Sequence, residues 1–309
     1  MISSVISPAY RAQVDLLLQV MPHVAKEDCF ALKGGTAINM FIWNMPRLSV
    51  DIDLTYLPFD DRSTAMKNIA AALHRIKDRI DAAIQGCKTS IAPQTDGQEA
   101  KLTCQHQGAQ IKIEVNTTIR GHLFAPQEMD VTDAVEEAFK RFVSMRVVAP
   151  AELFGGKICA ALDRQHPRDL FDIHQLYAQG DLSDDIRQGF LVYLLSSNRP
   201  IHEMIRPNFL DQRRAFETQF AGMTQEPFSY EDFEAVREWL VKDIHSGLSD
   251  TDRRFLLSFK SGDPDWSLFP YERLQDLPAV QWKLSNIQTL KSHNPAKHAE
   301  QLKALKERL

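Results

Sequence analysis

The chain has 309 residues, of which 44% are hydrophobic and 25% charged, and its formal net charge is −5. This length suffices for one large domain or two ordinary ones, and the composition is typical of a soluble globular protein rather than a fibrous or disordered one. The negative charge argues against indiscriminate nucleic-acid binding, which needs a basic domain, although it does not exclude a local basic patch.

The cysteines, the N-terminus and the hydropathy together indicate a cytoplasmic protein with no membrane partner. The cysteines form neither a Cys-x-x-Cys pair nor a zinc-type spacing, so we expect ordinary thiols in a reducing compartment. They are Cys29, Cys87, Cys104 and Cys159. The N-terminal sequence has no basic segment leading into an apolar run, so a signal peptide is not expected. No stretch has the apolar length needed to cross a bilayer.

A helix, a strand and a glycine turn are the first predicted elements. Apolar residues at helical spacing predict a helix over residues 7–24, and a short strand is expected over residues 30–33. Gly34 and Gly35 then lead into a predicted helix over residues 37–43. Glycines in this place let backbone N–H groups approach a phosphate, which the N-terminus of a helix also favours. The turn is therefore a candidate phosphate-binding site.

The next predicted strand carries two carboxylates, Asp51 and Asp53, on one face. Alternation along the strand separates an inward apolar set from an outward polar set. The inward set is Val50, Ile52 and Leu54, and the outward set is Ser49, Asp51, Asp53 and Thr55. With a rise of about 3.3 Å per residue, the two carboxylates stand roughly 6.6 Å apart. They are close enough to share divalent metal ions, and without a cation their like charges would repel.

A long helix and three strands follow, and the last strand offers a third carboxylate. These elements are predicted over residues 61–84, 88–92, 101–107 and 110–118. A turn is expected at Asp96 and Gly97, after the first of these strands. In the last strand, Lys112, Glu114 and Asn116 share a polar face. Glu114 alone would be a surface residue paired with Lys112, but the matched polar face makes it the best candidate for a third metal ligand.

The second half of the chain is predicted to be mainly helical. A helix over residues 130–142 and a strand over residues 145–148 come before it. The later helices are predicted over residues 150–164, 168–177, 184–196, 209–220, 230–244 and 248–259. The C-terminal tail carries Lys297, Lys303, Lys306 and Arg308 against Glu300 and Glu307. This tail fits an amphipathic terminal helix with a solvated basic face as well as it fits an RNA contact.

Lys157 lies in the first of these later helices, directly after Gly155 and Gly156. A glycine inside a helix costs about 1 kcal/mol relative to alanine, so we expect close packing against the sheet or a substrate here. A lysine beside an apolar stripe usually extends to solvent, but with the glycines clearing space it could reach a triphosphate. In the next helix, Asp169 and Asp172 share one face, where the helix dipole favours negative charge.

The string from the glycine turn to the Asp-x-Asp strand resembles motif I of the DNA polymerase β-type nucleotidyltransferases. It more closely resembles the AbiEii/AbiGii toxin family, the MenA-like nucleotidyltransferases of bacterial toxin–antitoxin systems. The matching residues are Gly34, Gly35, Thr36, Arg47, Ser49, Asp51, Ile52, Asp53 and Leu54. Lys157 followed by Arg168, Asp169 and Asp172 resembles the third and fourth motifs of this family, and the segment from Leu277 resembles its C-terminal region.

The resemblance implies an α/β (α+β) fold with a polymerase-β-like nucleotidyltransferase core and a mixed sheet. We expect this core domain over residues 1–149 and a helical C-terminal domain, which completes the active site, over residues 150–309. The implied activity is that of a type IV-like toxin that transfers a nucleotide from an NTP to an RNA acceptor, the 3′ end of tRNA. A cognate antitoxin is the expected protein partner.

The resemblance also implies a role for each site residue. Asp51, Asp53 and Glu114 would hold two Mg²⁺ ions. Lys157 would neutralise charge on the phosphates, and Asp169 would position Lys157 or accept the hydroxyl proton, while the role of Asp172 stays open. The residues expected to bind the nucleotide are Gly34, Gly35, Thr36, Arg47, Ser49 and Lys157.

Three alternative functions remain. The acceptor could be a small molecule or a protein, or the chain could be a nucleotide-binding module without catalytic activity. More distantly, residues Asp51 to Thr55 fit the Asp-x-Asp-x-Thr signature of haloacid-dehalogenase-like phosphatases. That fold needs an apolar strand before the first aspartate, which Arg47 and Ser49 interrupt here.

Overall fold

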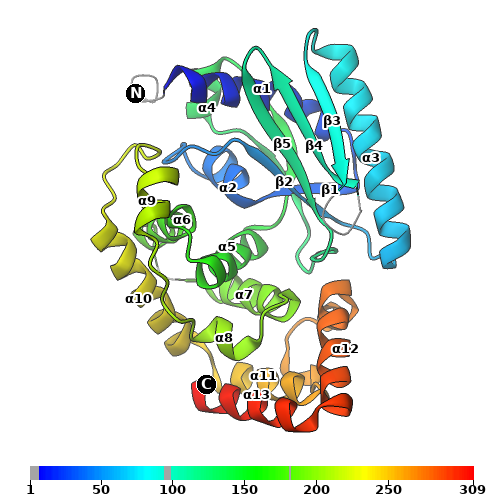
Figure 1. Ribbon diagram of the computed structural model, residues 1–309, viewed down its shortest axis with the longest axis vertical. Helices are drawn as coiled ribbons and strands as arrows, with labels where there is room; N and C mark the ends of the chain where they lie inside the picture. The colour runs from blue at the N-terminus through cyan, green and yellow to red at the C-terminus, as the bar shows by residue number, and fades with distance from the viewer. Residues whose placement is uncertain (1–6, 94–98, 181) are drawn as a thin grey trace. The chain divides into compact units, whose positions relative to one another are not determined.

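The computed structural model describes residues 7–93, 99–180 and 182–309. Contacts divide the chain into two compact units. Unit 1 comprises Met1–Ala149 and Gly222–Pro227, and unit 2 comprises Pro150–Ala221 and Phe228–Leu309. Each unit is described by itself below (Figure 1). The turn predicted at Asp96 and Gly97 lies outside the described residues.

Unit 1 is built around a mixed seven-stranded sheet with the strand order β3-β4-β5-β2-β1-β7-β6. Its strands are β1 (Phe30–Lys33), β2 (Asp51–Tyr56), β3 (Lys88–Pro93), β4 (Glu99–His106), β5 (Ala109–Asn116), β6 (Gln127–Asp130) and β7 (Ser144–Val147). The central strand β2 pairs in parallel with β5 and antiparallel with β1. The predicted α+β fold with a mixed sheet is confirmed.

Two long helices cover the apolar side of this sheet. They are α1 (Pro8–Val24), with Ser7 as its N-cap, and α3 (Arg62–Ala83), with Asp61 as its N-cap. Both contact the sheet, and α3 lies alongside β3 and β4 (Figure 1). Ile52 and Leu54 of β2 are completely buried, as their alternation predicted. Period-two burial on β2 therefore turns Asp51 and Asp53 to the other side of the sheet.

Four details of unit 1 differ from the predictions. The helix after the glycine turn begins earlier, with α2 (Gly34–Ala37), and continues as the π-helix η2 (Ile38–Ile42). Strand β6 was not predicted, because its residues are mostly polar and exposed and do not alternate between apolar and polar. The helix expected over residues 130–142 is the shorter α4 (Asp133–Phe139). Thr55, expected on the exposed face, is only 2% exposed.

Unit 2 is helical, and every strand in the described part of the chain lies in unit 1. Its α-helices are α5 (Pro150–Arg164), α6 (Pro167–Ala178), α7 (Asp184–Ser196), α8 (Ile201–Ile205), α9 (Arg213–Gln219), α10 (Tyr230–Gly247), α11 (Asp250–Ser261), α12 (Pro278–His293) and α13 (Pro295–Arg308). Two 3₁₀ turns, η3 (Trp266–Leu268) and η4 (Glu272–Asp276), join α11 to α12. Ser229 and Ser249 form capping boxes that begin α10 and α11. No helix in residues 7–93, 99–180 and 182–309 is long and apolar enough to cross a membrane.

Helices α5 and α7 cross at a pair of glycines. A Cβ atom on Gly155 would lie 2.2 Å from the carbonyl carbon of Gly189, and a Cβ atom on Gly189 would lie 1.9 Å from the carbonyl oxygen of Ala151. A Cβ atom on Gly156 would meet the ring of Tyr193 at 2.8 Å. The space cleared by Gly155 and Gly156 is therefore taken by α7, and our expectation of packing against the sheet or a substrate was wrong.

We expect Gly155→Ala to destabilise unit 2 by at least about 1–3 kcal/mol, the usual cost of overpacking a well-packed core, because the clash is with backbone atoms that cannot rotate away. The measurement is urea unfolding followed by circular dichroism. Gly247→Ala is the matched control, since a Cβ atom there would meet nothing within 4 Å. Equal midpoints for Gly155→Ala and the wild type would contradict this account of the crossing.

Candidate active site

The glycine turn lies directly against the carboxylate of Asp53. Lys33, the last residue of β1, is in register with Asp53 of β2, and Gly34 follows with a φ of +75°. A Cβ atom on Gly34 would lie 2.6 Å from Oδ2 of Asp53. Only glycine combines this left-handed backbone with such a close approach. The two halves of the predicted motif, the turn and the Asp-x-Asp strand, are therefore in contact.

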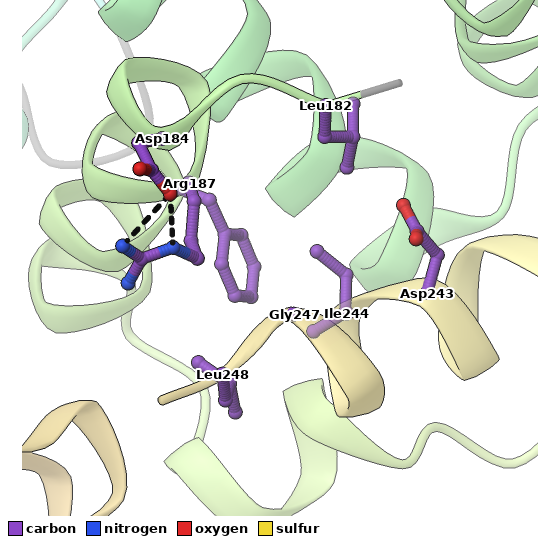
Figure 2. Close-up of a pocket in the computed structure, with 8 residues that line it drawn as sticks. Leu182, Asp184, Arg187, Asp243, Ile244, Gly247 and Leu248 are labelled. Atoms are coloured by element: carbon purple, nitrogen blue, oxygen red, sulfur yellow. Dashed lines mark hydrogen bonds and ion pairs between the residues drawn. The ribbon is translucent and has the colours of Figure 1, made fainter. Parts of the chain in front are cut away.

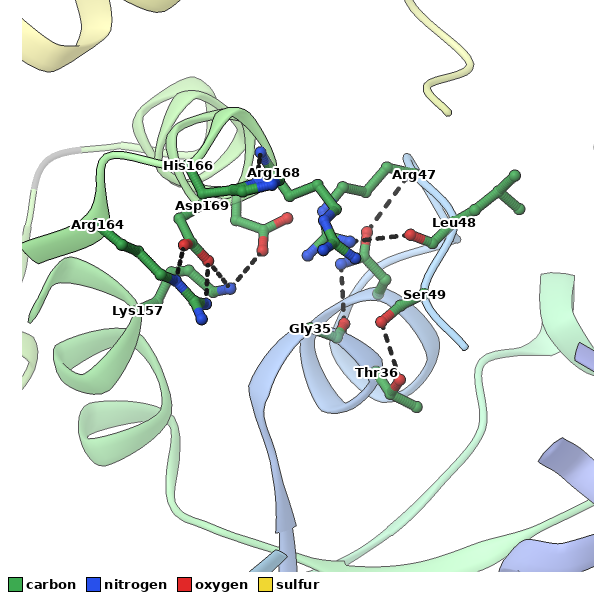
Figure 3. Close-up of polar contacts among 12 residues, drawn as sticks. Gly35, Thr36, Arg47, Leu48, Ser49, Lys157, Arg164, His166, Arg168 and Asp169 are labelled. Carbon is green, nitrogen blue, oxygen red and sulfur yellow. Dashed lines mark hydrogen bonds and ion pairs between the residues drawn. The ribbon is translucent and has the colours of Figure 1, made fainter. Parts of the chain in front are cut away.

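The side chains of Arg47 and Ser49 lie against the second glycine, Gly35 (Figure 3). A Cβ atom on Gly35 would lie 2.6 Å from Nη2 of Arg47 and 3.0 Å from Oγ of Ser49. Arg47 is only 3% exposed, and its Nη1 donates to the carbonyl of Leu48 at 2.9 Å. Residues separated by more than ten positions in the chain thus form one compact group around Gly35.

The hydroxyl of Thr36 points toward β2. Oγ1 of Thr36 lies 2.9 Å from Oγ of Ser49 and 2.5 Å from the backbone carbonyl of Asp51, and Thr36 is 1% exposed. This side chain joins the turn to the first residue of the Asp-x-Asp strand. It fixes the position of Asp51 relative to the glycines, and any contact of Thr36 with a phosphate would have to come from its backbone.

The three predicted carboxylates lie on neighbouring positions of two parallel strands. Asp51 and Asp53 are half-buried, with the buried Ile52 between them, and Asp53 is in register with Glu114 of β5. Glu114 forms an ion pair with Lys101 of β4, with 2.5 Å between Nζ and Oε1. Lys112, the partner expected for a surface Glu114, is instead in register with Asp51.

The donors on this face are of the right chemical kind for a divalent metal ion. Carboxylate oxygens are the ligands that Mg²⁺ prefers. Because Gly34 has no side chain, only its backbone atoms lie next to Oδ2 of Asp53. Within the described ranges, no three His, Cys, Asp or Glu side chains are grouped closely enough to hold a metal. Asp51 and Asp53 are thus of the right chemical kind for a metal ion without forming a complete ligand set, and Glu114 is paired with Lys101.

In unit 2, Lys157 lies in a buried ion network (Figure 3). Its Nζ is 2.8 Å from Oδ1 of Asp169 and 2.9 Å from Oδ2 of Asp172. The side chains of all three residues are at most 5% exposed. The lysine does not extend to solvent, so the ordinary expectation for a lysine beside an apolar stripe does not hold here. Asp172, whose role the sequence left open, contacts Lys157 as closely as Asp169 does.

Arg164 completes this network and was not predicted. Its Nε donates to Oδ2 of Asp169 at 2.6 Å and its Nη2 donates to Oδ1 at 3.0 Å, a bidentate pair. Burial alone would raise the pKa of Asp169, but Lys157 and Arg164 together hold this pKa well below its usual range. The spacing of Arg164 and Asp169 across the break at Pro167 gave no signal that the two side chains would meet.

One further pocket in unit 2 contains none of the predicted residues (Figure 2). Its volume is about 100 Å³, and α7 and α10 contribute most of its lining. The lining residues are Leu182, Asp184, Arg187, Phe190, Asp243, Ile244, Gly247 and Leu248. Arg187, its only basic lining residue, is paired with Asp184 and Asp252. This pocket therefore presents no unpaired cation to a phosphate.

The sequence profile of the nucleotidyl transferase AbiEii toxin family of type IV toxin–antitoxin systems matches residues 15–286, which is most of the chain. The chain therefore belongs to this family. It is therefore a nucleotidyltransferase toxin, and the phosphatase alternative is dropped. A toxin of such a system has an antitoxin as its partner.

The fold is shared with a solved toxin structure. MenT4, a nucleotidyltransferase toxin from Mycobacterium tuberculosis H37Rv, superimposes with a TM-score of 0.60 at 15% identity, over 90% of this chain and 93% of that chain. JHP933 from Helicobacter pylori matches with a TM-score of 0.42 at 17% identity, over 78% of this chain and 95% of that chain. No curated protein sequence matches the chain.

Proposed function

We propose that this toxin is a Mg²⁺-dependent enzyme that transfers a nucleotide from an NTP to the 3′ hydroxyl of an RNA acceptor, the end of a tRNA. The observation that carries the proposal is the contact between the turn at Gly34 and the carboxylate of Asp53. A backbone suited to phosphate and a carboxylate suited to a cation are placed side by side, as a metal-bound triphosphate requires.

The residues of unit 1 bind and orient the nucleotide in this proposal. Gly34 and Gly35 present backbone N–H groups to the phosphates, and Arg47 adds positive charge beside Gly35. Asp51 and Asp53 would hold Mg²⁺, with Glu114 as the third candidate ligand. When bound, the metal would neutralise phosphate charge and favour the ionised form of an attacking hydroxyl. Thr36 and Ser49 keep the turn and β2 in register through their hydroxyl contact.

Unit 2 is the helical domain that was expected to complete the active site. We propose that it contributes Lys157 and Asp169. Asp169 and Asp172 hold the ammonium group of Lys157 in one position, which is the preorganisation that electrostatic catalysis needs. Lys157 would neutralise charge that develops on the phosphates during transfer. Asp169 acts as a positioning residue, because both of its oxygens are already bonded to Lys157 and Arg164.

The test of this function is to incubate the protein with Mg²⁺, each labelled NTP and purified tRNA, and then to map the label. We expect label at the tRNA 3′ end, and no label when the tRNA carries a blocked 3′ terminus. Label on a small molecule or on a protein, with none on tRNA, would leave a nucleotidyltransferase but overturn the RNA acceptor. No transfer of any kind from NTP would overturn the proposed reaction.

The basic C-terminal helix gives a second measurement of the RNA acceptor. Exposed Lys297, Lys303 and Lys306 lie on α13, so we expect them to contact acceptor phosphates. Binding should then weaken as salt rises, because phosphate contacts release counterions. Replacing the three lysines with glutamine should raise the KM for tRNA and leave the KM for NTP unchanged. An unchanged salt slope in this variant would remove α13 from the proposed RNA contacts.

A further inference from the structure

Residues Gly222–Pro227 belong to unit 1, although the chain on both sides of them belongs to unit 2. The segment follows α9 and precedes α10, both of which are helices of unit 2. A short segment that leaves one unit for the other needs stabilising contacts, because ordering its backbone costs conformational entropy. Its backbone and side-chain hydrogen bonds reach residues 45–48 of unit 1.

The segment pairs with the chain that leads into β2. Thr224 forms an antiparallel bridge with Arg47. On one side of the bridge, the backbone N–H of Leu48 donates to the carbonyl of Met223 at 3.0 Å. On the other side, the backbone N–H of Gln225 donates to the carbonyl of Pro46 at 3.0 Å. We call Gly222–Pro227 the clamp, because its backbone bonds lie on both sides of Arg47.

Gln225 adds a side-chain hydrogen bond to Met45, the residue of the 45–48 stretch with a left-handed backbone. Its Nε2 donates to the carbonyl of Met45 at 2.7 Å. Met45 has a φ of +51° and is only 1% exposed. A left-handed backbone is uncommon for a residue other than glycine and persists only where the surroundings hold it. The Gln225 side chain is one of the groups that hold Met45 in this conformation.

From Met45 the contacts lead directly to the nucleotide site. The backbone N–H of Arg47 donates to Oδ1 of Asn39 at 3.3 Å, and Nδ2 of Asn39 donates to the carbonyl of Gly35 at 2.9 Å. The guanidinium of Arg47 itself lies against Gly35. Asn39 on η2 and the clamp from a distant part of the chain therefore both help to set the position of Arg47.

We infer that the clamp, Gly222–Pro227, positions Arg47 over the Gly34–Gly35 turn, and that Gln225 is a positioning residue for NTP binding. This inference rests on the proposed function in one respect, namely that the phosphates bind at this turn. The clamp acts through Arg47 and not on the reacting atoms. Its loss should therefore weaken NTP binding and leave the chemical step nearly unchanged.

The test compares Gln225→Met, which keeps the length of the side chain and removes its donor, with Gln85→Met, the same change at an exposed position of unit 1 outside the clamp. For Gln225→Met we expect the KM for NTP to rise about three- to tenfold, the worth of one hydrogen bond, with kcat within about twofold of the wild type. Gln85→Met should match the wild type in both. Unchanged KM in Gln225→Met, or an equal fall of kcat and kcat/KM, would overturn the positioning role.

A second readout does not depend on activity. Hydrogen exchange should speed up at the amide of Leu48 in Gln225→Met, because this amide donates to the clamp, while the amides of β2 keep their protection. If the wild type binds no NTP but Leu48 responds as described, the proposed function fails and the clamp stands. If Leu48 exchanges equally in both proteins, Gln225 does not maintain the clamp, and the inference fails whatever the activity.

Discussion

Asp53→Asn is expected to abolish nucleotide transfer while leaving the fold of unit 1 intact. Asp53 is the carboxylate in contact with the glycine turn, and an amide is a much weaker ligand for Mg²⁺. Removal of one preorganised electrostatic group costs about 10²–10³-fold in kcat, and loss of a metal ligand should cost at least that much. The measurement is the rate of label transfer from NTP, together with the circular dichroism spectrum.

Asp78→Asn is the matched control for this experiment. It makes the same chemical change at an exposed position on α3 and should leave transfer at the wild-type rate. Full activity in Asp53→Asn with an unchanged spectrum would contradict the proposed metal site.

Lys157→Ala is expected to destabilise unit 2 severely. The substitution leaves Asp169 and Asp172 buried without the ammonium group that lies within 3 Å of both. Breaking a buried ion pair by removing one partner costs about 3–5 kcal/mol, which is a large share of the stability of an ordinary domain. Thermal and urea unfolding measure the effect. Lys303→Ala, which removes an exposed lysine paired with Glu307, should change stability by at most about 1 kcal/mol.

The pH dependence of unfolding gives an independent check on the same network. Because the pKa of Asp169 is held below its usual value in the folded protein, its ionised form stabilises the fold at neutral pH. This contribution is present above the pKa of the unfolded state, about 4, and is lost as the pH falls below it. The wild type should therefore lose stability more steeply between about pH 4 and pH 2 than Asp169→Asn. Parallel curves for the two proteins would contradict the ion network.

The parts of the site that could be predicted are those whose residues follow one another closely in the chain. Gly34 and Asp53 are only 19 positions apart and belong to one motif. Period-two alternation alone places Asp51 and Asp53 on one face of β2. The same alternation on β5 located Glu114, and the structure does put it in register with Asp53. Local periodicity cannot report the neighbour on the next strand, so the pairing of Glu114 with Lys101 was not foreseen.

The parts that could not be predicted depend on contacts between distant residues. Gln225 and Met45 are 180 positions apart, and neither belongs to a motif. From the sequence, Gly155 was expected to leave room beside Lys157. In the structure, the backbone of Gly189 on α7 occupies this room. In both cases the sequence shows an unusual residue without its partner, and only the packing of the folded chain supplies the partner.

The clamp also has a consequence for the time at which a newly made toxin becomes competent. The last strand of the sheet ends at Val147, whereas the clamp begins at Gly222, about 75 residues later. At a synthesis rate of about 5–20 residues per second, the ribosome needs roughly 4–15 s to add them. During this interval the sheet and the glycine turn have already been synthesised, but Arg47 lacks its contacts with the clamp. On our inference, a nascent chain that has not yet reached Gly222 binds NTP more weakly than a chain that includes the clamp.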